Sequence, residues 1–174
     1  MKNYKEILYT IDTLIFDVDG VLTDGSLIVN TDGELLRKMN VKDGYALKAA
    51  IESGLNLAII SGGTNEGVRE RLRILGIKHI YLGAHNKVNQ LNEYIKSTSS
   101  DLNKIMYMGD DIPDIPVMKL VGLPCCPQDA ASEVKKVCNY VSDKNGGNGA
   151  VRDIIEQIMK IKKTWNNFNS AKID

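Results

Sequence analysis

The sequence is 174 residues long, which suits one domain with a sizeable hydrophobic core, and its 22 basic and 22 acidic side chains leave no net charge. This balance excludes a strong overall field for nucleic acid or a membrane surface, and no apolar run approaches the ~20 residues of a membrane span. The polar segment 1–10 is unlike a signal peptide, and three cysteines without metal-ligand spacing favour reduced thiols. We therefore expect a soluble cytoplasmic protein that binds neither nucleic acid nor a membrane.

Short apolar runs alternate with helix-like segments along the chain. After a lead-in over 1–11, the pattern predicts strands over 12–17, 55–60, 79–82, 104–108, 123–126 and 140–142. It predicts helices over 45–53, 64–75, 86–96, 113–120, from 129 and over 150–163, with Asp43 and Thr64 as caps of the first two. Alternating strands and helices indicate a Rossmann-like α/β fold with a parallel sheet covered by helices on both faces. We expect a single domain over 1–174, with a core of about 12–163 and a frayed tail over 164–174.

A small β-hairpin interrupts this alternation. Apolar residues within 26–30 and 34–39 flank the turn Thr31-Asp32-Gly33, and Asp-Gly between β-forming segments is a hairpin signal. A projecting hairpin of this size is marginal by itself, so packing against other subunits is one way to bury its side chains.

Two aspartates mark the end of the first predicted strand. Asp17 and Asp19 follow an apolar run directly, at the carboxyl end where open α/β sheets place their ligands. Gly20 indicates that the strand breaks into a loop, which lets both carboxylates converge. An isolated Asp-x-Asp pair is more often a solvated turn, but a buried strand before it favours a site. Two close carboxylates repel unless a cation or a proton separates them, and Mg²⁺ is a natural choice of cation.

Three further polar groups stand at the ends of apolar runs or at a helix start. Ser61 follows the run 57–60, Asp110 and its acidic neighbours follow 105–108, and Lys87 begins a predicted helix after Asn86. A carboxylate, a hydroxyl, a lysine and a second acidic pair, in this order, resemble the four motifs of the haloacid dehalogenase-like phosphatases.

The resemblance implies a catalytic role for four of these residues. Asp17 would attack phosphorus and form an aspartyl-phosphate, and Asp19 would act as general acid for the leaving alcohol and then as base for water. Ser61 would bind phosphoryl oxygens, and Lys87 would neutralise charge on the nucleophile and the phosphoryl group.

The resemblance also implies a metal site. Mg²⁺ would be held by the carboxylates of Asp17 and Asp110 and by the backbone carbonyl of Asp19, with Asp111 behind these ligands. Asp114 would orient Lys87 or its loop, or would simply complement a helix dipole, an alternative that the sequence leaves open.

The spacing of the motifs leaves no room for a cap domain. Between Asp17 and Ser61 there is space only for the hairpin and one helix, and between Ser61 and Lys87 for one helix and one strand. We therefore expect an open site, which must accept a macromolecule or borrow a lid from a neighbouring subunit.

Four segments narrow the resemblance: 17–25, 40–45, 109–118 and 146–152. They are similar to the 3-deoxy-D-manno-octulosonate 8-phosphate (KDO 8-phosphate) phosphatases, and the likeness extends over about 12–160. That family is capless and tetrameric, its hairpins pack at the tetramer centre, and a neighbour's C-terminal segment helps to close the site. The resemblance implies Mg²⁺-dependent hydrolysis of KDO 8-phosphate to KDO and phosphate in lipopolysaccharide precursor synthesis. It also connects Arg152 to the site, whereas Trp165 is either a docking anchor or exposed.

Substrate contacts follow from the resemblance by position. Lys48 and Arg71 suit the carboxylate of a sugar acid, although exposed helix charges are the ordinary interpretation. Gly63 departs from the Arg of many members and from the Glu of related phosphatases, so a nine-carbon sugar-acid 9-phosphate is the alternative substrate. The implied substrate-binding residues are Asn40, Val41, Lys42, Asp43, Gly44, Lys48, Gly62, Gly63, Arg71 and Lys87.

Two other function classes compete with an enzyme. A phospho-receiver switch also uses an aspartate, an acidic pocket, a hydroxyl and a lysine, but receivers place the acidic pair after the first strand and the phosphoacceptor after the third. Here Asp17 and Asp19 come first and the acidic pair comes late. A catalytically idle scaffold would keep the fold without needing every catalytic residue type, all of which are present.

Overall fold

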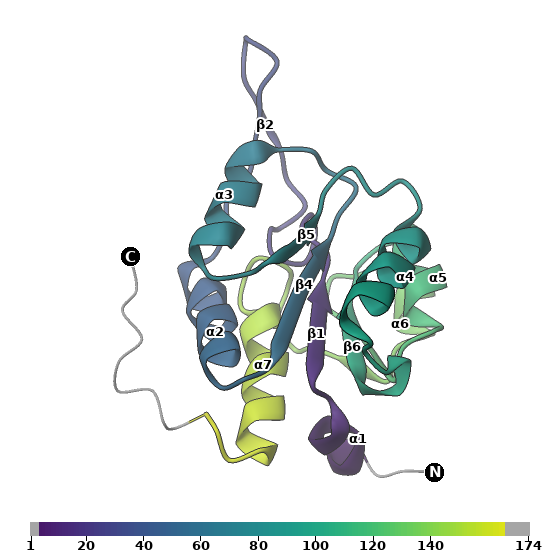
Figure 1. Ribbon diagram of the computed structural model, residues 1–174. Helices are drawn as coiled ribbons and strands as arrows, with labels where there is room; N and C mark the ends of the chain where they lie inside the picture. Colours follow the sequence, from purple (N-terminus) through teal and green to yellow (C-terminus); the bar gives the residue numbers. More distant parts are fainter. Residues whose placement is uncertain (1–3, 166–174) are drawn as a thin grey trace.

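The computed structural model describes residues 4–165 and contains a six-stranded, fully parallel sheet (Figure 1). Its strand order is β5-β4-β1-β6-β7-β8. The predicted α/β fold is confirmed, and each predicted strand lies within two residues of its observed bounds. The strands are β1 (Thr13–Phe16), β4 (Asn56–Ile60), β5 (His79–Tyr81), β6 (Ile105–Met108), β7 (Leu123–Cys126) and β8 (Tyr140–Val141).

Helices cover both faces of the sheet and form two cores. Along β1, Leu14 and Phe16 pack into one buried cluster with α2 and α7, whereas Ile15 packs into the other with α4, because neighbouring strand residues face opposite sides. Figure 1 shows α2, α3 and α7 on one side of the sheet and α4 to α6 on the other. The helices are α1 (Tyr4–Thr10), α2 (Val41–Glu52), α3 (Glu66–Ile74), α4 (Lys87–Thr98), α5 (Ile115–Met118), α6 (Ser132–Lys135) and α7 (Ala150–Ile161), with 3-10 turns η1 (Leu102–Lys104) and η2 (Ile112–Asp114).

The register of the central strands positions the site. Phe16, the last residue of β1, lies opposite Ile59 of β4 and Met108 of β6. Because the three strands are parallel, the residues that follow them emerge at the same edge of the sheet. The backbone N–H of Asp17 donates to the carbonyl of Met108 at 3.0 Å, so the ladder continues one residue beyond β1.

The predicted hairpin is present as β2 (Ile28–Val29) and β3 (Leu35–Leu36). The two strands are antiparallel and project away from the sheet, as Figure 1 shows. Ile28 is 63% exposed and Val29 71% exposed. Between the first two motifs the chain forms only this hairpin, α2 and β4, and between the second and third only α3 and β5, so the described chain carries no cap domain.

Several predicted boundaries were wrong. The lead-in 1–11 contains the helix α1, and α2 begins at Val41 because the side chain of Asn40, rather than Asp43, accepts the N-terminal N–H of Lys42 at 2.8 Å. Asn65, not Thr64, caps α3 through the N–H of Val68. The predicted helix 113–120 is η2 followed by the short α5, and the one expected from 129 starts at Ser132.

Asp43 instead connects α2 to the start of α7. Its buried carboxylate accepts the N–H groups of Arg152 at 2.8 Å and Gly149 at 3.3 Å, at the start of α7. Burial raises its pKa, against the effect of these hydrogen bonds. Nearby, Asn40 donates to the carbonyl of Gly147 at 3.1 Å, and Gly147 donates to the carbonyl of Val21 at 2.9 Å. The loop before α7 therefore covers the loop that follows β1.

The end of the described chain also packs on α2. The Trp165 ring lies edge-on to Tyr45, with centroids 6.2 Å apart, and the Arg152 guanidinium lies 5.5 Å from the Trp165 centroid. Trp165 is therefore an anchor on its own chain, and the remainder of the predicted tail falls outside the described residues. Arg152 also pairs with Glu156 at 2.6 Å. Among the residues described, no helix is long and apolar enough to cross a membrane.

Candidate active site

A cleft of about 510 Å³ opens at the carboxyl edge of β1, β4 and β6. It is formed by the loops that follow these strands and by the start of α4. Nine of the predicted site residues line it: Asp17, Asp19, Ser61, Gly62, Gly63, Lys87, Asp110, Asp111 and Asp114, and the other lining residues are Gly20, Gly25, Ala84, His85 and Pro113.

Asp17 lies on the floor of the cleft and is 7% exposed. Its Oδ1 accepts the N–H of Val18 at 2.6 Å and its Oδ2 accepts a hydrogen bond from Lys87 Nζ. Burial and the nearby Asp114 carboxylate raise the pKa of Asp17 to about 6, although Lys87 opposes this shift. One oxygen is thus fixed by the backbone and the other by a cation.

Lys87 is the first residue of α4 and is held between two carboxylates. Its Nζ donates to Asp17 and, at 2.7 Å, to Asp114 Oδ1. Burial works against its charge, but the two carboxylates outweigh burial and raise the Lys87 pKa. The ammonium therefore stays charged and aligned with the floor of the cleft.

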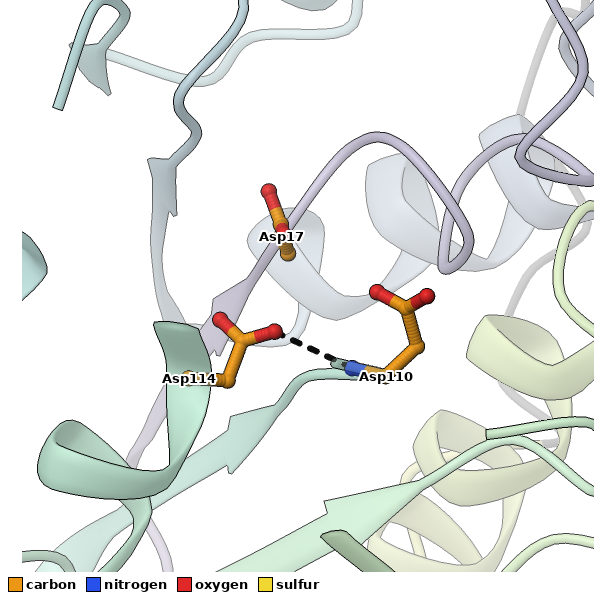
Figure 2. A group of neighbouring side chains, drawn as sticks. All are labelled: Asp17, Asp110 and Asp114. Atoms are coloured by element: carbon orange, nitrogen blue, oxygen red, sulfur yellow. Dashed lines mark hydrogen bonds between the residues drawn. The ribbon is translucent and has the colours of Figure 1, made fainter. Parts of the chain in front are cut away.

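Asp114 holds the acidic loop together. Its Oδ1 also accepts the hydroxyl of Tyr107 at 2.6 Å, and its Oδ2 accepts the N–H groups of Asp110 at 3.1 Å and Asp111 at 3.3 Å. Figure 2 shows the bond from Asp110. Gly109 permits this arrangement, because a Cβ there would lie 2.3 Å from the Asp114 carboxyl carbon. Burial and the Asp114 charge raise the pKa of the Tyr107 hydroxyl well above its usual value, so it remains a donor.

Asp110 faces Asp17 across the cleft. Burial, followed by repulsion from Asp114 and Asp17, raises its pKa to about 7. Gly20 lies beside it with φ +80°, and a Cβ on Gly20 would come within 2.0 Å of Asp110 Oδ2. Gly20 is therefore required both for its turn and for the position of this carboxylate.

These carboxylates fit a hard divalent cation. Oxygens of Asp17, Asp110 and Asp114 lie within 4.8 Å of one another (Figure 2), and burial together with mutual repulsion raises the pKa values of Asp17 and Asp110. A bound cation would offset both effects. The Asp114 oxygens already accept four hydrogen bonds, so Asp17 and Asp110 are the carboxylates with capacity for an ion. The role of the Asp19 carbonyl stays a prediction.

On the other side of the cleft, Asp19 is paired with a residue that the sequence did not indicate. Arg37 Nε donates to Asp19 Oδ1 at 2.7 Å and its Nη2 donates to Oδ2 at 3.0 Å. Ser61 is buried, and its hydroxyl accepts the N–H of Gly63 at 3.3 Å. Arg37 and Tyr107 were both missed, because an arginine at a hairpin end and a tyrosine within an apolar strand carry no local signal of a site.

The predicted substrate-binding residues do not all meet in this cleft. A separate hollow of about 300 Å³ between α2 and α3 is lined by Asn40, Val41, Gly44 and Arg71, together with Leu22, Met39, Leu47 and Leu75. Lys42, Asp43 and Lys48 do not line the carboxylate cleft, and the Asp43 carboxylate is fully buried against α7. Arg152 also lies away from it, on Tyr45 and Trp165.

Comparison with known proteins identifies the family of this chain. A family model described as haloacid dehalogenase-like hydrolase matches residues 76–155. The 3-deoxy-D-manno-octulosonate 8-phosphate phosphatase KdsC of Escherichia coli K12 is 38% identical over 146 residues, which are 84% of this chain and 78% of that protein. The chain belongs to this family of haloacid dehalogenase-like phosphatases.

Solved structures of the family have the same fold. The phosphatase from Yersinia pestis superimposes with a TM-score of 0.91 at 34% identity, covering 94% of this chain and 88% of that chain. The enzyme from Moraxella catarrhalis, solved with a magnesium ion, a phosphate ion and a KDO molecule, also has a TM-score of 0.91 at 34% identity and covers 94% of both chains. The predicted haloacid dehalogenase-like α/β fold is therefore confirmed.

Proposed function

We propose that the protein is a Mg²⁺-dependent phosphomonoesterase that hydrolyses KDO 8-phosphate to KDO and phosphate. The observation that carries the proposal is the arrangement of Asp17, Lys87 and Asp110 at the carboxyl edge of the sheet, with Asp19 across the same cleft. The KDO 8-phosphate phosphatase activity named for relatives of 38% identity supports the choice of substrate.

Asp17 performs the first displacement. Its carboxylate attacks phosphorus, a new carboxyl O–P bond forms, and the bond between phosphorus and the ester oxygen breaks. The electron pair goes to the sugar oxygen, which takes a proton from Asp19 and leaves as an alcohol. Lys87 contacts Asp17 and holds its positive charge where negative charge gathers, and Ser61 with the N–H groups that follow it is suited to the phosphoryl oxygens.

The second displacement regenerates the enzyme. Asp19 takes a proton from water, the water oxygen attacks phosphorus, and the bond to Asp17 breaks with its electron pair returning to the carboxylate. Asp17, Asp110 and the Asp19 carbonyl would hold Mg²⁺, which, when bound, neutralises the phosphoryl charge. Asp111 and Asp114 position these ligands, since Asp114 accepts the N–H groups of Asp110 and Asp111.

The assembly and location belong to the same proposal. The exposed Ile28 and Val29 of the hairpin suit burial against other copies, and a homotetramer closed by a neighbour's C-terminal segment would complete the open cleft. The hollow with Asn40, Val41, Gly44 and Arg71 would serve the site through that assembly. A cytoplasmic, single-domain enzyme of lipopolysaccharide precursor synthesis follows from the family.

The test is phosphate release from KDO 8-phosphate and, in parallel, from a nine-carbon sugar-acid 9-phosphate. We expect turnover of KDO 8-phosphate that needs Mg²⁺ and is abolished by a chelator. Asp17→Asn is nearly isosteric and should abolish turnover while the protein stays folded. Asp143→Asn, the same change at an exposed aspartate paired with Lys144, is the matched control and should keep full activity.

Each other outcome has a definite meaning. Preference for the nine-carbon substrate would keep the mechanism and change the substrate, with Gly63 as the first residue to examine. Absence of Mg²⁺-dependent turnover with any phosphate ester would contradict the proposal in favour of a receiver-like switch or a scaffold. A switch would still accept a phosphoryl group on Asp17 but would release it slowly.

A further inference from the structure

Arg37 comes from the hairpin, yet its side chain is buried at the cleft. It follows β3, whose two residues are exposed, but the Arg37 side chain is only 7% exposed. Its guanidinium makes a two-pronged contact with Asp19, with N–O distances of 2.7 and 3.0 Å, and Nη1 donates to the carbonyl of Leu35 at 3.0 Å. Such a planar fork fixes the orientation of a carboxylate as well as its distance.

Gly63 leaves the space that this contact needs. A Cβ on Gly63 would lie 3.1 Å from Arg37 Nη2 and 3.3 Å from Asp19 Oδ2, closer than side chains ordinarily approach. The same Cβ would lie 3.7 Å from the Ser61 hydroxyl, so the fork is formed at the edge of the phosphoryl-binding loop. The absence of a side chain at Gly63 therefore allows the Arg37 guanidinium to occupy this position.

The hairpin end that carries Arg37 is itself fixed. The carbonyl of Leu35 accepts Asn65 Nδ2 at 3.2 Å in addition to Arg37 Nη1. Asn65 also caps α3, because its Oδ1 accepts the N–H of Val68 at 2.9 Å. The guanidinium is therefore aligned by its own backbone, by a helix start and by Asp19, and little rotamer freedom remains to it.

We propose that Arg37 is a positioning residue for the proton transfer, and that Gly63 admits it. This inference rests on the proposed function, in which Asp19 gives its proton to the leaving sugar oxygen. Arg37 acts through Asp19, because its fork sets the direction of that carboxyl group within the cleft. A correctly directed acid matters when the leaving group is a poorly stabilised alkoxide, and matters little when the leaving group is already a weak base.

The experiment compares two leaving groups. Arg37→Gln removes the charged fork, and we expect kcat for KDO 8-phosphate to fall about 10- to 100-fold, within the range that a general acid contributes. The kcat for p-nitrophenyl phosphate should change by less than about threefold, because p-nitrophenolate leaves without a proton. Arg37→Lys should lie between these values, and Gly63→Ala should give a smaller loss of the same kind. Lys38→Gln, at the neighbouring exposed residue paired with Asp24, is the matched control and should leave both rates unchanged.

A double-mutant cycle tests whether Arg37 acts through Asp19. Arg37→Gln should add nothing to Asp19→Asn, since the group that it directs is already absent. Equal losses for both substrates, or losses that add to those of Asp19→Asn, would mean that Arg37 only supports the hairpin. An unchanged alkyl rate in Arg37→Gln would also overturn the inference.

Two measurements distinguish failure of the positioning role of Arg37 from failure of the proposed phosphatase function. Mg²⁺-dependent turnover of p-nitrophenyl phosphate by the unaltered protein, absent in Asp17→Asn, tests the phosphatase without involving Arg37. Failure of that control rejects the proposed function, whereas its success with uniform losses in Arg37→Gln rejects only the positioning role. If Arg37→Gln does not fold, Arg37→Lys and Gly63→Ala carry the same comparison.

Discussion

Two ion pairs lie on opposite sides of the cleft, one formed by Lys87 and the other by Arg37, and they differ in burial and in the elements that carry them. On the floor, Lys87 contacts Asp17 and Asp114, and all three side chains are at most 10% exposed. At the rim, Arg37 contacts Asp19, which is 36% exposed. The residues of the floor come from the loops after β1 and β6 and from the first turn of α4. Arg37 of the rim follows the two short strands of the projecting hairpin.

The difference separates two requirements of the chemistry. A nucleophile and its cation must keep one geometry through both displacements, and burial in a rigid parallel sheet provides this. A group that first gives and later takes a proton must reach a leaving oxygen and then a water molecule, so partial exposure suits it. Mutations in the floor should therefore change both rate and stability, whereas mutations at the rim should change rate alone.

Removal of the floor cation should have the largest effect. Lys87→Met removes the cation between Asp17 and Asp114, and we expect kcat to fall on the order of 10³-fold because charge stabilisation of the transition state is lost. Lys144→Met alters an exposed lysine paired with Asp143 and should leave kcat unchanged. Steady-state kinetics with p-nitrophenyl phosphate measures both, and a loss below tenfold in Lys87→Met would contradict a central role for the floor.

Asp114 should be the main stabilising residue of the floor. Asp114→Ala removes the acceptor of Lys87, Tyr107 and two backbone N–H groups, and we expect a loss of about 3 kcal/mol in the free energy of unfolding. Urea denaturation measures this loss. Asp143→Ala, which removes an exposed ion pair, should change stability by less than about 0.5 kcal/mol, and similar values for the two variants would refute the buried network.

A comparison of alanine variants at two glycines with positive φ distinguishes the cost of backbone strain from an effect on the metal site. Gly20→Ala and Gly33→Ala both place a side chain at φ near +80°, at +80° and +86° respectively, and each should cost about 1–2 kcal/mol. Only Gly20 has a neighbour in the way, since a Cβ on Gly33 meets nothing within 4 Å. We expect the Kd for Mg²⁺ to rise about 10-fold or more in Gly20→Ala and to stay unchanged in Gly33→Ala. Isothermal titration would show whether the two variants differ as required.

The floor carboxylates should make stability depend on pH and Mg²⁺ together. The pKa of Asp17 is raised to about 6 and that of Asp110 to about 7 in the folded, metal-free protein, from 3.8. The stability that they contribute is therefore complete below pH ~4 and is lost as the pH rises through ~7. Mg²⁺ binds the ionised carboxylates, so the rise in Tm on adding Mg²⁺ should be larger at pH ~8 than at pH ~5. Equal shifts in Tm at both pH values would place the ion elsewhere.

Much of the fold followed from local patterns. Short, mainly apolar runs of three to six residues predicted the strands of the sheet, because a strand covered by helices on both faces is largely apolar. Because the strands of an open α/β sheet place their ligands at their carboxyl ends, the sequence also predicted that Asp17, Ser61 and Asp110 lie at one edge of the sheet. These predictions succeeded because the apolar runs and the polar residues that follow them are both visible in the sequence.

The failures were decided by tertiary contacts. Asn40 and Asp43 both suit a helix start, and only the packing of α7 against α2 makes Asn40 the cap and turns Asp43 toward Arg152. Arg37 reaches Asp19 because the hairpin returns over Gly63, a geometry that depends on residues 26 positions apart in the chain. Side chains whose partners lie on another element leave no periodic signal in the sequence.

The loop before α7 has a consequence for biosynthesis. Gly147 donates to the carbonyl of Val21, and a Cβ on Gly146 would lie 1.9 Å from the Gly20 carbonyl oxygen, so this late segment covers the loop that follows Asp17 and contains Asp19. While the ribosome is still synthesising α7, the first motif has no cover and α2 lacks the helix that buries Asp43. The nascent chain can therefore cover the loop that follows β1 only after the segment before α7 has been synthesised.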